Sequence, residues 1–359
     1  MKLMSANKTL VFLSMLFISF QVLALETDNY LAWTVELKDS TNAINGYIEE
    51  QINIAIEQAN RRKYLPHCQE MTKLVARRFK TNPPMKHPME DWLRENLTEE
   101  HVYPHNAWYS NESIYKYPSR FYLKGMMIAP NVRIGNVNLG TDKLSHFAST
   151  GRRYLEHYLK KIRKGYSTEE ANKSAIRFGL WNEMTILGFW PGGVFSYGDM
   201  EANYQGFTFF KKLCLDETDP YLEQDENGYW NLKKSPNIGD YVSAYWDETF
   251  NLSIRDRWNW ANTSYVIRKE YCPMMKDKKI IDRMENYRNA KHTSFSLEYI
   301  KELQNDHFKN SPIPEVYQSV EELCSEDSES KLQIRDVSED FFAHTTENDI
   351  DIINPDHEL

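Results

Sequence analysis

The stretch that decides the fold class is LGTDKLSHFASTGRRYLEHYLKKIR, residues 139–163. Its apolar side chains recur every three or four positions, which is the spacing of a helix with one buried face. This stripe consists of Leu144, Phe147, Ala148, Gly151, Tyr154, Leu155, Tyr158, Leu159 and Ile162. The pattern therefore predicts a helix that begins near Leu139 and packs along one side.

A second helix is predicted directly after this one. Ser167 and Glu170 have the spacing of a capping box, in which each side chain bonds to the other residue's backbone N–H. The helix that starts there should run toward Phe189. Its second half, residues 178–190, is apolar on nearly every side, so we expect it to be buried in the middle of the protein.

A third helix follows a break at residues 191–193, Pro-Gly-Gly. Ser196 with Asp199 is a helix-start signal, and the helix should continue to about Leu213. Residues 81–138 contain scattered prolines and are predicted to be long loops with one short helix at 89–96 and a small hairpin. Other helices are predicted at 42–62, 68–79, 238–249, 262–271, 278–290 and 296–305, and residues 225–228 are predicted to join two loops.

The composition supports a single globular body. The chain has 359 residues, of which 41% are hydrophobic, enough to bury a sizeable core, and no clean linker divides it. We therefore predict a mainly α fold, an irregular multi-helix globular domain with long loops over residues 25–324. Its core site region is expected at residues 139–213.

The first 24 residues have the pattern of a secretory signal peptide. Lys2 and Lys8 precede an apolar run over residues 10–16, and Val22 and Ala24 fit the cleavage pattern. The alternative, a membrane anchor, needs about 20 apolar residues. Cleavage would leave a periplasmic or secreted chain without a transmembrane anchor.

The negative charge of the chain is concentrated at its end. Residues 321–359 hold 13 acidic residues against one Lys and one Arg, whereas the whole chain has a net charge of −9. The rest is therefore close to neutral and offers no basic patch for nucleic acid, so no such partner is expected. Residues 325–359 are predicted to be an acidic, mobile tail.

The cysteines are expected to form disulfides. Cys68, Cys214, Cys272 and Cys324 lie far apart and lack the spacing of a zinc site. An even count in an exported chain favours two disulfides, with three possible pairings. The favoured pairing is Cys214 with Cys272 and Cys68 with Cys324.

Glu183 is the first candidate for a catalytic residue. It is the only charge in the apolar segment 178–190, and burial raises the pKa of a carboxyl group toward that of a general acid. Asp199, near a helix N-terminus, should stay ionised and act as the second carboxylate of a glycosidase. The alternative is that Glu183 forms an ion pair with an internal arginine such as Arg177 or Arg153.

Asp142 and His146 are four residues apart, so both should project from one face of the predicted helix 139–163. This face is either solvated or lines a cleft with Glu183. In the second case Asp142 could orient the His146 imidazole, or the two could bind a metal. Asp199 and Asn203 repeat the four-residue spacing on the next helix, and together these side chains have the composition of an oxygen-rich metal site in a helical bundle.

The sequence DKLSHF at residues 142–147 resembles the D-K-x-x-H-F helix of uncharacterised bacterial envelope proteins, the VanZ-like membrane proteins and the YfiM-like lipoproteins. Gly198 and Asp199 loosely match later positions of this group. The resemblance covers about a fifth of the chain. It implies a location in the bacterial envelope and a functional role for Asp142 and His146, but not a particular reaction.

The favoured function from the sequence is an exported glycosidase-type hydrolase of peptidoglycan without a cofactor. Glu183 would be the general acid and Asp199 the base, with His146 held by Asp142. The expected substrate-binding residues are Asn203, Trp181 and Tyr197. The first alternative is a divalent-metal-dependent lipid or phosphoester hydrolase with the ligands Asp142, His146, Glu183 and Asp199. The second is a non-enzymatic envelope scaffold.

Overall fold

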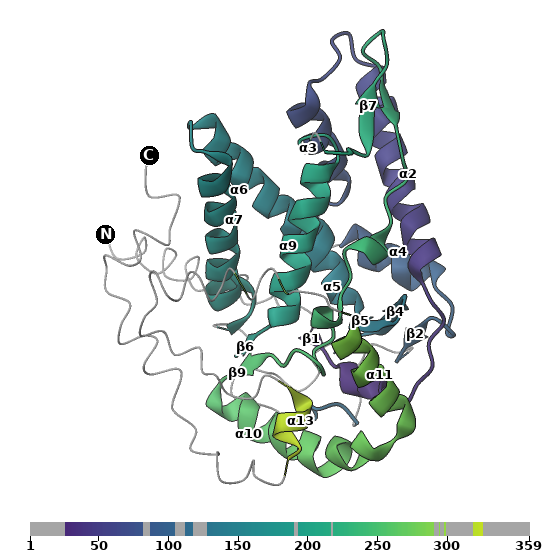
Figure 1. Ribbon diagram of the computed structural model, residues 1–359, viewed down its shortest axis with the longest axis vertical. Coiled ribbons are helices and arrows are strands. Elements are labelled where there is room, and N and C mark those ends of the chain that lie inside the picture. The colour runs from purple at the N-terminus through teal and green to yellow at the C-terminus, as the bar shows by residue number, and fades with distance from the viewer. Residues whose placement is uncertain are drawn as a thin grey trace, which may run out of the picture.

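Three long helices pack together, with α6 (Gly151–Arg163) in contact with both α7 (Thr168–Asn182) and α9 (Tyr197–Lys212) (Figure 1). The computed structural model describes residues 26–81, 87–104, 112–117, 128–189, 193–216, 218–290, 294, 298 and 319–325. Within these ranges the protein is mainly helical with few, short strands, as the sequence predicted.

The helix predicted over residues 139–163 is present but begins later and contains a wider turn. It runs from α5 (Thr141–Ser145) through the π-helical segment η2 (His146–Thr150) into α6, with right-handed helical backbone at both junctions. Residues 137–140 instead form strand β5 (Val137–Gly140), which pairs with β4 (Asn131–Ile134) in the hairpin expected in this region. A second π-helical segment, η3 (Glu183–Leu187), follows α7. Trp190 and residues 191–192 lie outside the described residues.

The predicted helix starts at Ser167 and Ser196 are confirmed. The Ser167 hydroxyl accepts a hydrogen bond from the Glu170 backbone N–H, and the Glu170 carboxylate accepts one from the Ser167 N–H. The Ser196 hydroxyl accepts the backbone N–H of Asp199 at 3.0 Å. Both caps satisfy N–H groups that a helix start leaves without intrahelical partners.

Two glycines allow the central helices to cross closely. A Cβ atom at Gly206 of α9 would lie 1.9 Å from the carbonyl oxygen of Phe147. A Cβ atom at Gly151 of α6 would lie 2.7 Å from the carbonyl carbon of Gly206. Since real side chains essentially never come this close, only glycine fits at this crossing.

An N-terminal helical layer packs against this centre. It contains α2 (Thr41–Asn60) and α3 (Cys68–Arg78), close to the predicted ranges, and contacts the hairpin β7 (Leu222–Gln224) and β8 (Trp230–Leu232) at the top of Figure 1. The expectation of two loops around residues 225–228 was wrong, because this stretch is the turn of that hairpin. The short helix α4 (Pro88–Asn96) is where the sequence predicted it.

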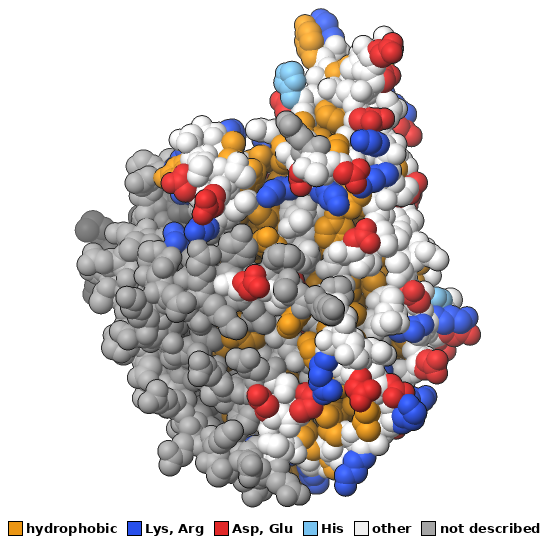
Figure 2. Space-filling view, in the orientation of Figure 1, with side chains coloured by type: hydrophobic (Ala, Val, Ile, Leu, Met, Phe, Trp, Pro, Cys, Tyr) orange, Lys and Arg blue, Asp and Glu red, His pale blue; other side chains and the backbone are white. Residues whose placement is uncertain are grey.

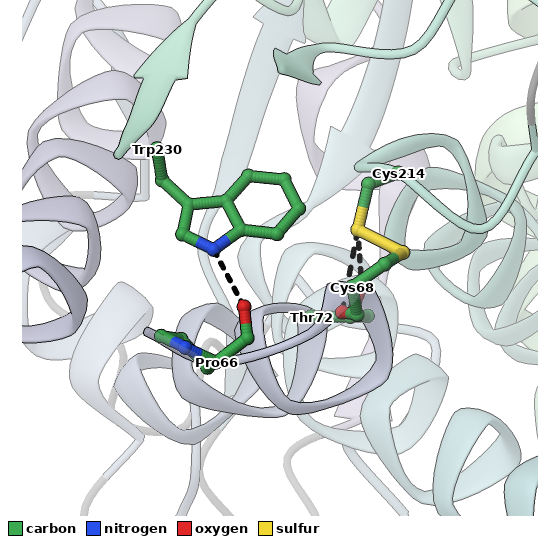
Figure 3. Close-up of a disulfide and its surroundings, with 5 residues drawn as sticks. All are labelled: Pro66, Cys68, Thr72, Cys214 and Trp230. Carbon is green, nitrogen blue, oxygen red and sulfur yellow. Dashed lines mark hydrogen bonds between the residues drawn. A yellow bond between two sulfur atoms is a disulfide. The ribbon is translucent and has the colours of Figure 1, made fainter. Parts of the chain in front are cut away.

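The favoured disulfide pairing was wrong. Cys68 is bonded to Cys214, and Cys272 to Cys324. The first bond joins Cys68, the first residue of α3, to Cys214, which follows α9 (Figure 3). Beside it, the Trp230 indole N–H donates to the Pro66 carbonyl at 2.9 Å, so the hairpin and α3 are fastened at the same place. Spacing along the chain could not reveal these contacts because they depend on how the helices pack.

The C-terminal part of the described chain is helical and lies at the bottom of Figure 1. It contains α10 (Arg257–Val266), the π-helical η6 (Ile267–Tyr271), the 3-10 helix η7 (Cys272–Lys276), α11 (Lys278–Asn289) and α13 (Val320–Leu323). The helix predicted over 238–249 was wrong, because only the 3-10 turns η4 (Ile238–Asp240) and η5 (Ala244–Trp246) form there. Most of the helix predicted at 296–305 lies outside the described residues.

The remaining strands are short, and one of them begins the described chain. Strand β1 (Glu26–Thr27) runs parallel to β3 (Ile128–Ala129), β2 (Val102–Tyr103) pairs with β4, and β6 (Val194–Phe195) pairs with β9 (Ile254–Arg255). The 3-10 turn η1 (Asn29–Ala32) follows β1. Among the described residues, no helix combines the length and apolarity needed to cross a membrane. The predicted signal peptide and nearly all of the predicted tail lie outside the described residues.

Candidate metal centre

Charged side chains of both signs are interspersed on the face shown in Figure 2, but one group of charged residues is buried. These residues are at most 9% exposed, although ionisable side chains are rarely buried without partners. We call them the central cluster, which consists of Glu26, Asp142, Lys143, His146, Glu183, Asp199 and Glu248.

The wide π turns place two members of the cluster. His146 is the first residue of η2, and Glu183 is the first residue of η3. π-Helical turns are rare and occur frequently at functional sites. The third member, Asp199, lies in the first turn of α9, next to its Ser196 cap. Three consecutive helical segments therefore direct one polar side chain each to the same place.

His146, Glu183 and Asp199 form a triad of side chains that could together bind a metal ion. One ligand atom from each residue lies within 4.8 Å of those of the other two. Two ligands that are each about 2.1 Å from one tetrahedral metal are separated by about 3.4 Å. The side chains of the widest pair, at most 4.8 Å apart, would therefore have to approach by up to about 1.4 Å on binding the ion.

The imidazole of His146 is held from both sides. Its Nδ1 lies 3.1 Å from Asn203 Oδ1, and its Nε2 lies 3.3 Å from Asp199 Oδ2. If Nδ1 donates its proton to Asn203, a neutral ring turns the lone pair of Nε2 toward the carboxylate. Two lone pairs facing each other repel, so a proton or a metal cation is needed between them. A hydrogen bond on the other ring nitrogen is the usual support of a metal-binding histidine.

Glu183 has one oxygen in use and one without a partner. Its Oε1 accepts the Ser196 backbone N–H at 3.3 Å, whereas Oε2 is buried and has no hydrogen-bond partner among the described residues. A buried oxygen without a partner costs free energy, which a proton or a metal ion would offset. Gly188 lies against this carboxylate, since a Cβ there would be 2.3 Å from Oε1.

The Lys143 ammonium group lies among three carboxylates. Its Nζ is 2.6 Å from Asp199 Oδ1, 2.7 Å from Glu248 Oε1 and 2.9 Å from Asp142 Oδ2. Burial alone would lower the pKa of Lys143, but these carboxylates hold it well above its usual value. Lys143 is therefore charged, and it occupies one oxygen of Asp199.

The central cluster holds more negative than positive groups. Glu26, Asp142, Glu183, Asp199 and Glu248 face Lys143 and, next to Glu248, the buried Arg255 at 4.0 Å. Burial raises the pKa of Glu26, Asp142 and Glu183. Burial opposes ionisation of Asp199 as well, but His146 and Lys143 bring its pKa below the usual value. The excess negative charge must be neutralised by protons or by a bound cation.

Only some of the candidate site residues proposed from the sequence interact as predicted. Asp142 does not hold His146, because its carboxylate is engaged by Lys143 and by the Thr27 hydroxyl. The solvated-face alternative for Asp142 and His146 was wrong, since both are buried. Asn203 contacts His146 rather than open solvent.

The two other side chains predicted to bind substrate make contacts of a different kind. The Tyr197 ring packs edge-on against Phe195, and burial raises its pKa to about 12. Trp181 is partly buried, and its carbonyl accepts the Thr185 hydroxyl at 2.6 Å. Pairing of Glu183 with Arg153 is also not observed, as the Arg153 guanidinium donates to Asn182 at 3.2 Å.

The sequence reasoning missed Lys143, Glu248 and Glu26. Lysine is normally solvated, and nothing in the local pattern indicated that this one is fully buried. Glu248 had one signal: the segment 246–249, Trp-Asp-Glu-Thr, echoes residues 181–185, Trp-Asn-Glu-Met-Thr. The two glutamates of these segments belong to the same buried cluster.

The donor set of the triad suits a divalent transition metal. An imidazole nitrogen with two carboxylates favours ions such as Zn²⁺, Mn²⁺, Fe²⁺ or Co²⁺, because Ca²⁺ and Mg²⁺ prefer oxygen ligands alone. Three protein ligands leave positions for water or substrate, as in catalytic rather than structural sites. Comparison with family models, curated proteins and solved structures finds no match to this chain.

Proposed function

We propose that this chain is an exported, divalent-metal-dependent hydrolase whose metal ligands are His146, Glu183 and Asp199. The observation that carries the proposal is that one ligand atom from each of these three residues lies within 4.8 Å of the other two. The carboxylate of Glu183 is held in place because its Oε1 accepts a hydrogen bond from the Ser196 backbone N–H. The unpartnered Glu183 Oε2 and the excess of buried carboxylates give independent support.

The residues around the triad have defined roles in this proposal. Asn203 fixes the His146 ring so that Nε2 faces the metal position, and Lys143 holds Asp199 through Oδ1. A bound metal would polarise the scissile group and lower the pKa of a bound water to near neutrality. The protein itself supplies ligands that packing and hydrogen bonds hold in place, which reduces the reorganisation needed during the reaction.

The glycosidase remains the second candidate, because one observation favours it. Burial raises the pKa of Glu183, whereas His146 and Lys143 bring the pKa of Asp199 below its usual value in spite of burial. Opposite shifts of two neighbouring carboxyl groups are typical of a general acid and its partner. Glycosidases, however, separate these groups by about 5–5.5 or 6.5–9.5 Å. Here one carboxylate oxygen of Glu183 lies within 4.8 Å of one of Asp199, closer than either of these separations, which favours the metal site.

The envelope as the site of action rests on the disulfides and the predicted signal peptide. Cys68–Cys214 and Cys272–Cys324 are bonded, and disulfides persist in oxidising compartments. We infer that the substrate is a component of the envelope or its surroundings. Phosphoesters and lipid esters are proposed before glycans, because a metal centre polarises their P=O and C=O groups directly.

The test is hydrolysis by the purified mature chain on a phosphodiester, a lipid ester and a peptidoglycan gel, before and after chelation. The proposal expects activity that is lost on chelation and restored by Mn²⁺ or Zn²⁺. Glycan cleavage that survives chelation and is lost in Glu183→Gln would favour the glycosidase instead. Absence of all activity together with absence of metal binding would favour the scaffold.

Asn203 offers a graded test of the same proposal. Replacing it with Ala removes the hydrogen bond on His146 Nδ1 without removing a ligand. We expect metal affinity to fall by about 10–100-fold while the number of bound ions stays at one, as for other residues that orient a metal ligand. Isothermal titration with Zn²⁺ measures both, and unchanged affinity would contradict the assigned role of Asn203.

A further inference from the structure

We infer that Asp199 bridges two cation positions, and that the Lys143 ammonium permanently fills the second one. The first position is the triad, which Asp199 faces through Oδ2, 3.3 Å from His146 Nε2. The second is the site around Lys143 Nζ, which lies 2.6 Å from Asp199 Oδ1. This inference deepens the proposed function, and only its account of the triad rests on that function.

The surroundings of Lys143 Nζ are those of a bound cation. Carboxylate oxygens of Asp142, Asp199 and Glu248 lie within 2.9 Å of it, and the Thr27 hydroxyl lies at 3.4 Å. Oxygen ligands from three carboxylates and a hydroxyl are also what Mg²⁺, Ca²⁺ and Mn²⁺ bind in proteins. The difference is that here the cation is part of the chain.

The fold is arranged to hold the ammonium at this point. Lys143 is 1% exposed, and its Cε would lie 3.0 Å from a Cβ at Gly198, so a glycine on α9 leaves space for its stem. The oxygen of Glu248 that faces Lys143, Oε1, also accepts a hydrogen bond from the Ser196 hydroxyl at 2.7 Å. Ser196 also caps α9, so the second position is connected rigidly to the helix that carries Asp199.

Asp199 can offer only one of its two carboxylate oxygens to a metal at the triad. Because Oδ1 is held by Lys143, only Oδ2 is available to the triad, and Glu183 likewise offers only Oε2. Lys143 is thus a positioning residue that keeps the centre mononuclear. A two-metal hydrolase bridges its ions with a carboxylate in the same way, and in this chain a lysine replaces one ion.

The experiment is metal stoichiometry with MnCl2 alone, by equilibrium dialysis of the mature chain and two variants. Lys143→Ala empties the second position and leaves its oxygens, whereas Lys143→Met keeps it filled with an uncharged stem. We expect one Mn²⁺ in the wild type, two in Lys143→Ala and one in Lys143→Met. Adding Glu248→Gln to Lys143→Ala should lower the affinity for the second Mn²⁺ at least tenfold. A purely structural lysine would leave the stoichiometry unchanged, so a Lys143→Ala variant that binds no more Mn²⁺ than the wild type overturns the inference.

The result separates this inference from the proposed function. If the wild type binds no Mn²⁺ but Lys143→Ala binds one, the triad proposal fails and the inference about Lys143 holds. If Lys143→Ala does not fold alone, refolding is repeated with MnCl2 and followed by near-UV circular dichroism. Recovery that depends on Mn²⁺, and is absent when Glu248→Gln is added, supports the inference. Failure to recover at any Mn²⁺ concentration overturns it.

Discussion

Replacing Gly206 with Ala should loosen the helix crossing on which the candidate metal centre depends. The new Cβ would lie 1.9 Å from the Phe147 carbonyl oxygen, 1.5 Å less than the 3.4 Å of ordinary contact. Backbone lies on the other side of the contact, so α9 must move away from η2. Overpacking of this kind costs about 1–3 kcal/mol, and the helix-forming advantage of Ala over Gly recovers only about 0.5–1 kcal/mol. Because the opposing atom is backbone and cannot move aside, the cost should lie at the upper end of this range, and we expect a net loss of about 2 kcal/mol.

The movement should also affect metal binding, because η2 carries His146 and α9 carries Asp199. Metal–ligand distances are held to within about 0.2 Å, so a shift of this size should lower Zn²⁺ affinity at least tenfold. Urea unfolding measures the stability, and isothermal titration measures the affinity. The matched control is Gly46→Ala on α2, where nothing lies within 4 Å of the new Cβ and a small stabilisation is expected. If both variants gain stability alike, the close crossing is not present.

Two further predictions concern stability. The Cys68–Cys214 bond joins residues 146 positions apart, and its removal by Ser substitution should lower the unfolding free energy by about 5 kcal/mol. The Cys272–Cys324 bond joins residues 52 positions apart, and its removal should cost about 4 kcal/mol. Chemical unfolding that shows no loss in either variant would contradict the pairing. Burial raises the pKa of Asp28 from 3.8 to about 6, so the proton stabilises the fold, and the stabilisation is full below pH 4 and lost as the pH rises through 6. The unfolding free energy should therefore fall by about 2 kcal/mol more between pH 4 and 7 in the wild type than in Asp28→Asn. Parallel pH curves for the two proteins would show that Asp28 does not titrate in this way.

The parts of the fold that the sequence predicted are those with local causes. The apolar stripe of residues 144–162 and the caps at Ser167 and Ser196 act within one or two turns, and the structure contains the helices that they indicate. The π turn at His146 was not predictable from that stripe, because an α-helix and a helix with one wide turn bury similar residues. The helix predicted at 238–249 failed since its apolar residues pack from irregular turns.

The candidate site was predictable only where the residue type was itself unusual. Glu183 stood out because a single charge in an apolar segment must find a partner or a proton. Lys143 and Glu248 did not, since their burial depends on the approach of segments about 100 residues apart in the chain. The disulfide partners were hidden for the same reason. Contacts between distant segments are set by packing, which no spacing along the chain records.

The most direct test of the metal centre is the metal content of the mature chain after equilibrium dialysis against Zn²⁺ and Mn²⁺, measured by mass spectrometry of the elements. We expect one ion per chain in the wild type and none in Glu183→Gln at the same free concentration. The matched control is Glu201→Gln, an equally buried glutamate on α9 whose carboxylate bonds to Gln205 and Ser294 instead. It should keep its ion. A wild-type chain that binds no ion, or a Glu183→Gln variant that binds as tightly as Glu201→Gln, would contradict the assignment of the triad.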